Sequence, residues 1–128
     1  MRRRLAFARW LDQSGTSAVE FALIAPAMLT MVIGCMEVGR LIWVAGALNY
    51  AVGEAARCAS VTPSVCGTAT QITTYASKKI PANIAPASAF TSTSPSCGHQ
   101  VSASLSYPFT VMHMYSQTIT LTAKACLL

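Results

Sequence analysis

Residues 15–40 read GTSAVEFALIAPAMLTMVIGCMEVGR. Glu20 and Glu37 bound a run, residues 21–36, that contains no charged side chain. Residues 18–36 would form a helix of about 28 Å at 1.5 Å per residue, which nearly crosses the roughly 30 Å hydrocarbon core of a bilayer. A carboxylate at the edge of such a segment is costly, so Glu20 is a candidate functional residue by default.

The composition and charge of the chain agree with a membrane anchor. Only 10% of the residues are charged and 53% are hydrophobic, whereas soluble domains have about 25% charged residues. Residues 1–15 carry a net charge of +3 and the remainder +2. A basic N-terminus ahead of an apolar segment predicts a cytoplasmic leader, residues 1–15. The remaining cations do not gather into a run, so we expect no nucleic-acid partner.

The distribution of carboxylates excludes several kinds of chemistry. No Asp or Glu follows Glu54. The C-terminal half therefore lacks paired catalytic carboxylates, a carboxylate cage for Ca²⁺ or Mg²⁺, and an acid to orient a Ser–His pair. No phosphate-binding loop or nucleotide fingerprint is present. We therefore expect a protein that is not an enzyme and that needs no metal or cofactor.

Residues 16–57 are predicted to form one long helix. Residues 18–36 would span the membrane, and the pattern then becomes amphipathic, with Leu41, Val44, Leu48 and Val52 at helical spacing. Pro26 removes one backbone hydrogen bond and should kink the helix, which membrane helices tolerate.

Three glycines, Gly39, Gly46 and Gly53, recur at seven-residue intervals along this helix. On a helix they make a smooth stripe where a second helix can approach closely. Chance in a Gly/Ala-rich segment explains the spacing equally well. Glycine nevertheless costs helix stability, so three on one face favour a packing role.

Residues 58–128 are predicted to be a small head tied by disulfides. Four of the five cysteines, Cys58, Cys66, Cys97 and Cys126, lie beyond the apolar run. An even number of cysteines in a small exported domain predicts two disulfides and an oxidising compartment. A capping-box pattern from Thr68 to Gln71 predicts a short helix that packs through Ile72, Tyr75, Ala76 and Ile80 and ends at Pro81. Residues 81–96 should form a connector with a short strand near residues 87–93.

The end of the chain alternates between apolar and polar residues. Val101, Ala103, Leu105 and Tyr107 form one row, and Ile119, Leu121, Ala123 and Ala125 form another. These rows predict an antiparallel hairpin. If residue 107 pairs with residue 116, Cys97 lies opposite Cys126. This register favours a Cys97–Cys126 bridge and, by elimination, Cys58–Cys66, although cysteine positions alone leave the connectivity open. The predicted fold class is α+β.

The segment Gly15-Thr16-Ser17-Ala18-Val19-Glu20-Phe21 resembles the processing site of type IV prepilins. In that family a prepilin peptidase cuts after a glycine, and a glutamate is the fifth residue of the mature chain. Here the cut would fall between Gly15 and Thr16, with Glu20 at the fifth position. Together with Pro26 and the run from Glu37 to Arg40, this region resembles the TadE-like pseudopilins of tight-adherence pili. Classical pilins have Phe or Met where this chain has Thr16.

The resemblance implies a type IV pilin-like protein of the bacterial inner membrane. The N-terminus would be cytoplasmic and the head periplasmic. The implied partners are prepilin peptidase, other pilins and the assembly platform of a pilus used for surface attachment. Cleavage would expose the Thr16 amine, which could neutralise Glu20 of a neighbouring subunit or, at i,i+4, of the same helix. We expect Glu37 and Arg40 to form a local ion pair at the outer membrane boundary.

Other readings compete with this one. The chain could keep its N-terminus and act as a membrane-anchored periplasmic binding or adhesive module. Val32-Ile33-Gly34-Cys35 fits a lipoprotein signal with Cys35 as the lipidated residue, although apolar helix continues beyond it. The triplet Met112-His113-Met114 offers soft metal ligands, but an apolar loop tip is the better interpretation.

Overall fold

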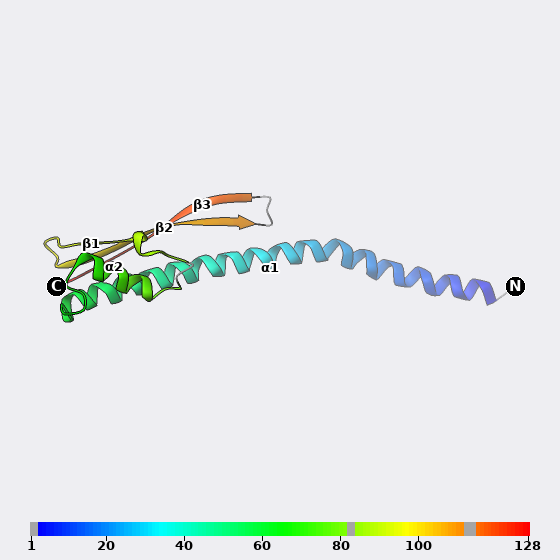
Figure 1. Cartoon of the computed structure of the whole chain (residues 1–128). Helices are drawn as coiled ribbons and strands as arrows, with labels where there is room; N and C mark the ends of the chain where they lie inside the picture. The colour runs from blue at the N-terminus through cyan, green and yellow to red at the C-terminus, as the bar shows by residue number, and fades with distance from the viewer. Residues whose placement is uncertain (1–2, 82–83, 112–114) are drawn as a thin grey trace. The chain divides into compact units, whose positions relative to one another are not determined.

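The computed structural model describes the backbone of residues 3–81, 84–111 and 115–128, and the side chains of residues 15–81, 84–110 and 116–128. The chain divides into two compact units, Met1–Met36 and Glu37–Leu128. Its elements are the helices α1 (Arg3–Val61) and α2 (Ala69–Lys78), the 3₁₀ turn η1 (Ala87–Ala89), and the strands β1 (Phe90–Thr93), β2 (His99–Val111) and β3 (Tyr115–Leu127) (Figure 1). The predicted α+β class is confirmed.

Helix α1 is longer at both ends than the predicted residues 16–57. It begins at Arg3 because residues 3–13 are rich in Leu, Ala, Arg and Gln, which favour helix, and contain no Gly or Pro. It ends at Val61 because Pro63 disfavours the helical conformation at Thr62. Pro26 lies inside the helix, which continues through it. The kink at Pro26 stays a prediction.

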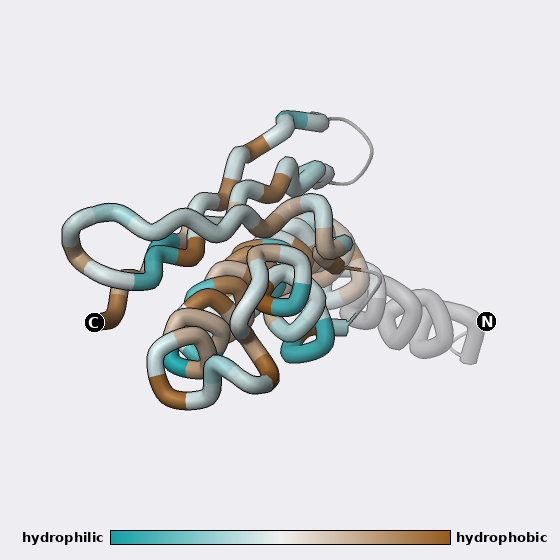
Figure 2. The backbone as a smooth tube through the Cα atoms, turned by 60° about the vertical axis from the view of Figure 1, so that its left-hand side comes forward, coloured by the Kyte–Doolittle hydropathy of each residue, from teal (hydrophilic) through white to brown (hydrophobic). Residues whose placement is uncertain are grey.

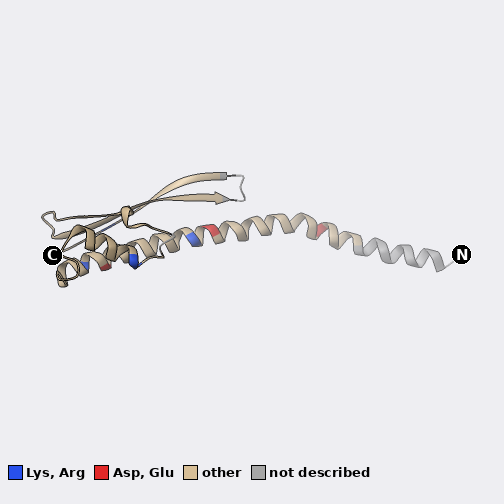
Figure 3. Cartoon of the chain, in the orientation of Figure 1, with Lys and Arg blue, Asp and Glu red and all other residues tan. Residues whose placement is uncertain are grey.

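The first unit leaves its apolar side chains uncovered. Phe21 is 73% exposed, Leu23 75% and Met31 72%. Among the described residues, one helix, within Gly15–Val61, is long and apolar enough to cross a membrane. None of the 18 residues of its most apolar stretch is buried inside the protein. Figure 3 shows a long tan stretch of α1 without a red or blue position, which corresponds to the uncharged residues 21–36. These side chains therefore have no partner in their own chain, as expected for a segment that faces lipid.

The second unit is built on one face of α1. Leu48, Val52 and Ala55 of this face are at most 1% exposed. They belong to the same buried cluster as residues of α2 and the sheet, including Ile72 and Val101. Small residues on this face, such as Ala55, allow the sheet and α2 to approach the helix closely. In Figure 1 both α2 and the sheet lie along the C-terminal part of α1.

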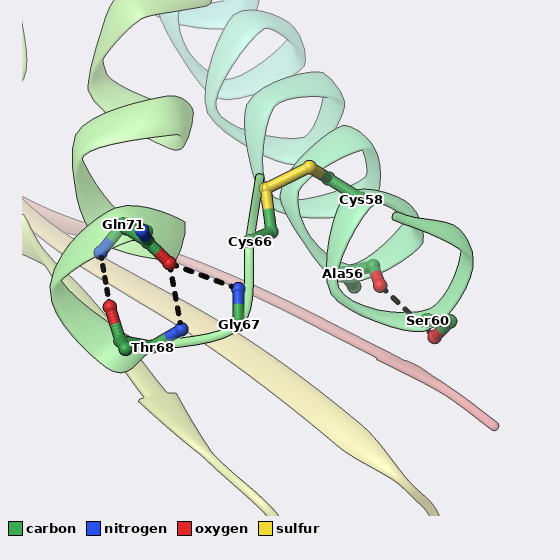
Figure 4. Close-up of a disulfide and its surroundings, with 7 residues drawn as sticks. All are labelled: Ala56, Cys58, Ser60, Cys66, Gly67, Thr68 and Gln71. Atoms are coloured by element: carbon green, nitrogen blue, oxygen red, sulfur yellow. Dashed lines mark hydrogen bonds between the residues drawn. A yellow bond between two sulfur atoms is a disulfide. The ribbon is translucent and has the colours of Figure 1, made fainter. Parts of the chain in front are cut away.

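Helix α2 begins with the predicted capping box. The Thr68 hydroxyl accepts a hydrogen bond from the Gln71 amide at 3.3 Å, and the Gln71 side-chain oxygen accepts from the amides of Gly67 and Thr68, both at 3.1 Å (Figure 4). The predicted inner face is confirmed for Ile72 and Ala76, which are buried, and Tyr75 packs at the edge of the cluster. The helix ends at Lys78, before the predicted end at Pro81, so Ile80 is buried in the segment that follows it. The capping-box pattern in the sequence therefore predicted the start of α2 correctly.

The sheet is antiparallel, in the order β1-β2-β3. The two alternating rows were predicted correctly: Val101 pairs with Ala125, and Tyr107 with Ile119. Figure 2 shows separate brown, hydrophobic positions along the strands with paler positions between them. The predicted pairing of residue 107 with residue 116 was wrong. That pairing joins odd to even positions, so it would have put the two apolar rows on opposite faces of the hairpin.

Strand β2 continues through Pro108, which pairs with Thr118. Strand β1 pairs only with residues 100–103 of β2. Pro108 therefore lies where β2 has β3 as its one described strand neighbour. A proline without a ladder amide is tolerated at such an edge.

Both predicted disulfides are confirmed. The Cα–Cα distance is 5.7 Å for Cys58–Cys66 and 6.2 Å for Cys97–Cys126. Cys126 lies opposite Gln100 in the ladder, so Cys97 reaches it through the turn that precedes β2. Gly98 closes this turn by donating to the Pro95 carbonyl at 3.0 Å. Its φ of 108° and the close approach of the Leu127 carbonyl both require glycine.

We predict unequal contributions from the two disulfides to the stability of the head. In the chain-entropy relation a loop of 8 residues contributes about 2.5 kcal/mol and one of 29 residues about 3.6 kcal/mol. The double variant Cys97→Ser/Cys126→Ser should therefore lose about 1 kcal/mol more than Cys58→Ser/Cys66→Ser. Urea unfolding of the full chain in detergent, followed by near-UV circular dichroism, measures both.

Cys35→Ser is the matched control, because Cys35 is the free, exposed cysteine of the described residues. It should unfold like the parent protein. A larger loss from the Cys58–Cys66 pair would contradict the loop-length argument.

Candidate functional site

The predicted processing residues lie on α1 in the first unit. Gly15 and Thr16 are both exposed, and a Cβ built at Gly15 would meet nothing within 4 Å. Glu20 and Phe21 are exposed one turn further along. Residues four apart share a helix face, so Thr16 and Glu20 lie on the same side of α1. The geometry is compatible with a contact within the helix and with a contact to a neighbour.

Glu37 and Arg40 begin the second unit, and here the prediction of a local ion pair was wrong. Within the described part of the chain, neither side chain makes a salt bridge. Arg40 is exposed and Glu37 half-buried. Exposed ion pairs contribute only about 0–1 kcal/mol, which hardly offsets the entropy of holding two long side chains in one geometry. Arg40 is therefore available to other groups.

The glycine stripe takes no part in the core of the head. A Cβ added at Gly39, Gly46 or Gly53 would meet nothing within 4 Å. The core is built instead on the face that carries Leu48 and Val52. The stripe leaves room for a second helix, and its role in helix packing stays a prediction.

No group of three or more potential metal ligands comes together among the His, Cys, Asp and Glu residues that the structure describes. Cys97 is held in a disulfide, so its sulfur is not free to act as a thiolate ligand. Met112, His113 and Met114 lie outside the described residues.

Sequence reasoning missed a pocket in the second unit. It has a volume of about 380 Å³ and is lined by residues of α1, of the segment after α2 and of β2: Arg40, Trp43, Val44, Pro81, Ile84, Leu105, Ser106, Tyr107 and Pro108. The available signal was the pair Arg40 and Trp43, a basic and an aromatic residue just beyond an apolar segment. The other walls come from distant parts of the chain, which sequence spacing does not reveal.

A smaller hollow of about 240 Å³ lies on α2. Tyr75 lines it, and the Lys79 ammonium lies 4.8 Å from the centre of the Tyr75 ring. Hydrogen bonding to the Tyr75 side chain raises the pKa of Lys79 above its ordinary value, and the charge interaction with Tyr75 adds to this. The ammonium is therefore charged at neutral pH, which suits a surface contact and not proton transfer.

The comparison with protein families gives one match. Residues 15–57 match the family described as TadE-like protein. The match begins at Gly15 and ends within α1, so it covers about a third of the chain and leaves the head outside. Over this segment the resemblance to TadE-like proteins is confirmed. No curated protein and no solved structure was found to match.

The open space at the glycine stripe leads to a prediction about stability. Gly46→Leu should change the free energy of unfolding of the head by less than about 1 kcal/mol, because the new side chain meets nothing and leucine favours helix. Ala55→Leu should destabilise the head by about 1–3 kcal/mol, because Ala55 is fully buried. Urea unfolding of both variants in detergent tests this. An equal loss in both would show that the stripe is packed against the head.

Proposed function

From this TadE-like helix we propose that the chain is a minor pilin, or pseudopilin, of a tight-adherence (Flp-type) pilus used for surface attachment. It is inserted in the bacterial inner membrane and cleaved after Gly15 by a prepilin peptidase. It then takes part in pilus assembly with other pilins and the assembly platform. The observation that carries the proposal is the family match, which begins at the residue where the cut is expected.

The positions of the basic residues and of the disulfides support a single-pass protein with a cytoplasmic N-terminus and a periplasmic head. The basic residues of the leader favour a cytoplasmic N-terminus. Both disulfides, Cys58–Cys66 and Cys97–Cys126, lie in the head, and disulfides persist in oxidising compartments such as the periplasm. A structural role without catalysis agrees with a head that has no carboxylate after Glu54.

Cleavage changes the charge balance at the membrane edge. Before cleavage, Glu20 is an isolated carboxylate at the end of an apolar helix, which is costly in hydrocarbon. After cleavage, the Thr16 amine supplies a positive charge in the same layer. Pairing this amine with Glu20 of an adjacent subunit neutralises both groups and sets the stagger between the helices. In this mechanism the Thr16 amine that pairs with Glu20 exists only in subunits that have been cleaved.

The test of processing is the intact mass and N-terminal sequence of protein extracted from membranes of cells that contain the peptidase. The expected N-terminus is Thr16. Gly15→Val should retain residues 1–15, because the peptidase is expected to require the small residue before the cut. Gly34→Val is the matched control, since a Cβ at Gly34 also meets nothing; it should be processed normally.

Retention of residues 1–15 by the parent protein would contradict the pilin assignment and leave an uncleaved periplasmic binding or adhesive module. A lipidated N-terminus at Cys35 would instead establish a lipoprotein.

The assembly role of Glu20 can be tested with Glu20→Gln, which keeps the shape and removes the charge. Membrane insertion should be unchanged, whereas incorporation into pili should fall about tenfold or more, because the neighbouring amine is left without its partner. Immunoblots of sheared pili and of membranes measure the two quantities. Glu37→Gln, at the other end of the apolar run, should assemble normally. Normal piliation of Glu20→Gln would rule out the pairing role.

A further inference from the structure

We propose that the pocket beside Arg40 binds the headgroup of an anionic phospholipid from the membrane that holds α1. The inference rests on the membrane anchoring proposed above and not on pilus assembly. The pocket belongs entirely to the second unit, since its walls run from Arg40 to Pro108. Its volume of about 380 Å³ is at the lower end of ligand pockets, which suits a headgroup and not a whole lipid.

The position of Arg40 in the chain matches the headgroup layer. Arg40 follows Met36, the last residue of the apolar run, by four residues of continuous helix. At 1.5 Å per residue it lies about 6 Å further along the helix. The polar layer of a bilayer is about 5–8 Å thick on each side of the hydrocarbon core. A helix that holds residues 18–36 in hydrocarbon therefore carries Arg40 at the depth of the lipid phosphates.

The charge of the pocket selects an anion. Arg40 is the one charged residue among the lining residues that the structure describes. Among the described residues the Arg40 guanidinium has no salt bridge or hydrogen-bond partner, so its donors are free to bind a phosphate in a bidentate manner. The described residues of the lining include no carboxylate, so the ammonium of a zwitterionic lipid would find no counter-ion among them. Tyr107, which lines the pocket from β2, carries a hydroxyl that suits a polyol headgroup.

The apolar part of the lining fits the same occupant. Trp43 is 56% exposed, and Tyr107 is half-buried beside the pocket. Trp and Tyr are enriched at membrane interfaces because their rings combine an apolar body with a polar group. Ile84 and Leu105 add apolar surface that the glycerol backbone and the first methylenes of the lipid can cover. Phosphatidylglycerol therefore fits the pocket better than phosphatidylcholine.

The experiment uses the full chain in nanodiscs that contain equal amounts of phosphatidylglycerol and phosphatidylcholine. Native mass spectrometry after release from the disc reports which lipid stays bound. We expect one phosphatidylglycerol retained, about tenfold in excess of phosphatidylcholine, and a roughly tenfold loss of that lipid in Arg40→Gln, because a charge-assisted hydrogen bond is removed. Arg57→Gln is the matched control, an exposed cation of α1 outside the pocket, and should retain the lipid.

A second measurement does not depend on lipid surviving release. In a Trp10→Phe background Trp43 is the only tryptophan, and phosphatidylglycerol brominated near the top of its acyl chains should quench its fluorescence more than brominated phosphatidylcholine does. Arg40→Gln should remove the difference. An unchanged near-UV circular dichroism spectrum shows that the Arg40→Gln variant is folded. Arg40→Lys keeps the charge but loses the forked guanidinium, so its difference in quenching between the two lipids should lie between those of the parent protein and Arg40→Gln.

Several outcomes would overturn the inference: equal retention of both lipids, unchanged phosphatidylglycerol binding in Arg40→Gln, displacement of the lipid by millimolar inorganic phosphate, or a lipid-free dimer that shields Trp43 from both quenchers. Resistance of the protein to carbonate extraction separates the two proposals. An inserted protein without bound phosphatidylglycerol contradicts only the lipid site, whereas an extractable protein contradicts the anchoring itself.

Discussion

The structure depends on one helix that meets two different environments. In hydrocarbon backbone polar groups must be satisfied within the segment, and α1 runs as one helix from Arg3 to Val61, with Pro26 leaving out a single hydrogen bond. Its side chains are apolar on all sides over residues 21–36 and buried on one face from Val44 to Ala59. Nearly half of the buried hydrophobic residues described belong to α1. The head therefore has no core of its own without the helix that carries it.

Because the head shares its core with α1, the two disulfide bonds make an important contribution to its stability. Its largest fully buried side chains are Leu48, Val52, Val101 and Cys66, so the core is made of small and medium residues. No buried polar or charged residue is present among those described. A core of this size stabilises a small domain only marginally. The two disulfides close the end of α1 and the open end of the hairpin, where the hydrogen bond from the Ser60 hydroxyl to the Leu127 carbonyl, at 3.4 Å, also joins the two elements.

Local signals in the sequence predicted most of this fold. The capping box from Thr68 to Gln71, the two alternating rows and the apolar run depend on neighbours close in the chain, and all of them appear in the structure. The hairpin register was predicted wrongly because the pairing of residue 107 with residue 116 was assumed, although the parity of the two apolar rows excludes it. The predicted pairing of Cys97 with Cys126 was still correct, because the turn at Gly98 brings Cys97 back toward Cys126. The Arg40 pocket could not be predicted, since its three walls come together only in the fold.

The boundary of the TadE-like match, residues 15–57, follows from the two environments of α1. The matched segment contains the uncharged apolar run and also Leu48, Val52 and Ala55, which belong to the buried core of the second unit. The matched segment therefore also contributes a face with small residues, against which the rest of the head packs. Any small sheet with an apolar face of suitable shape can pack on that surface, because helix–sheet packing is governed by close approach and volume. The packing surface of the head is therefore partly encoded in the matched segment, although the rest of the head lies outside it.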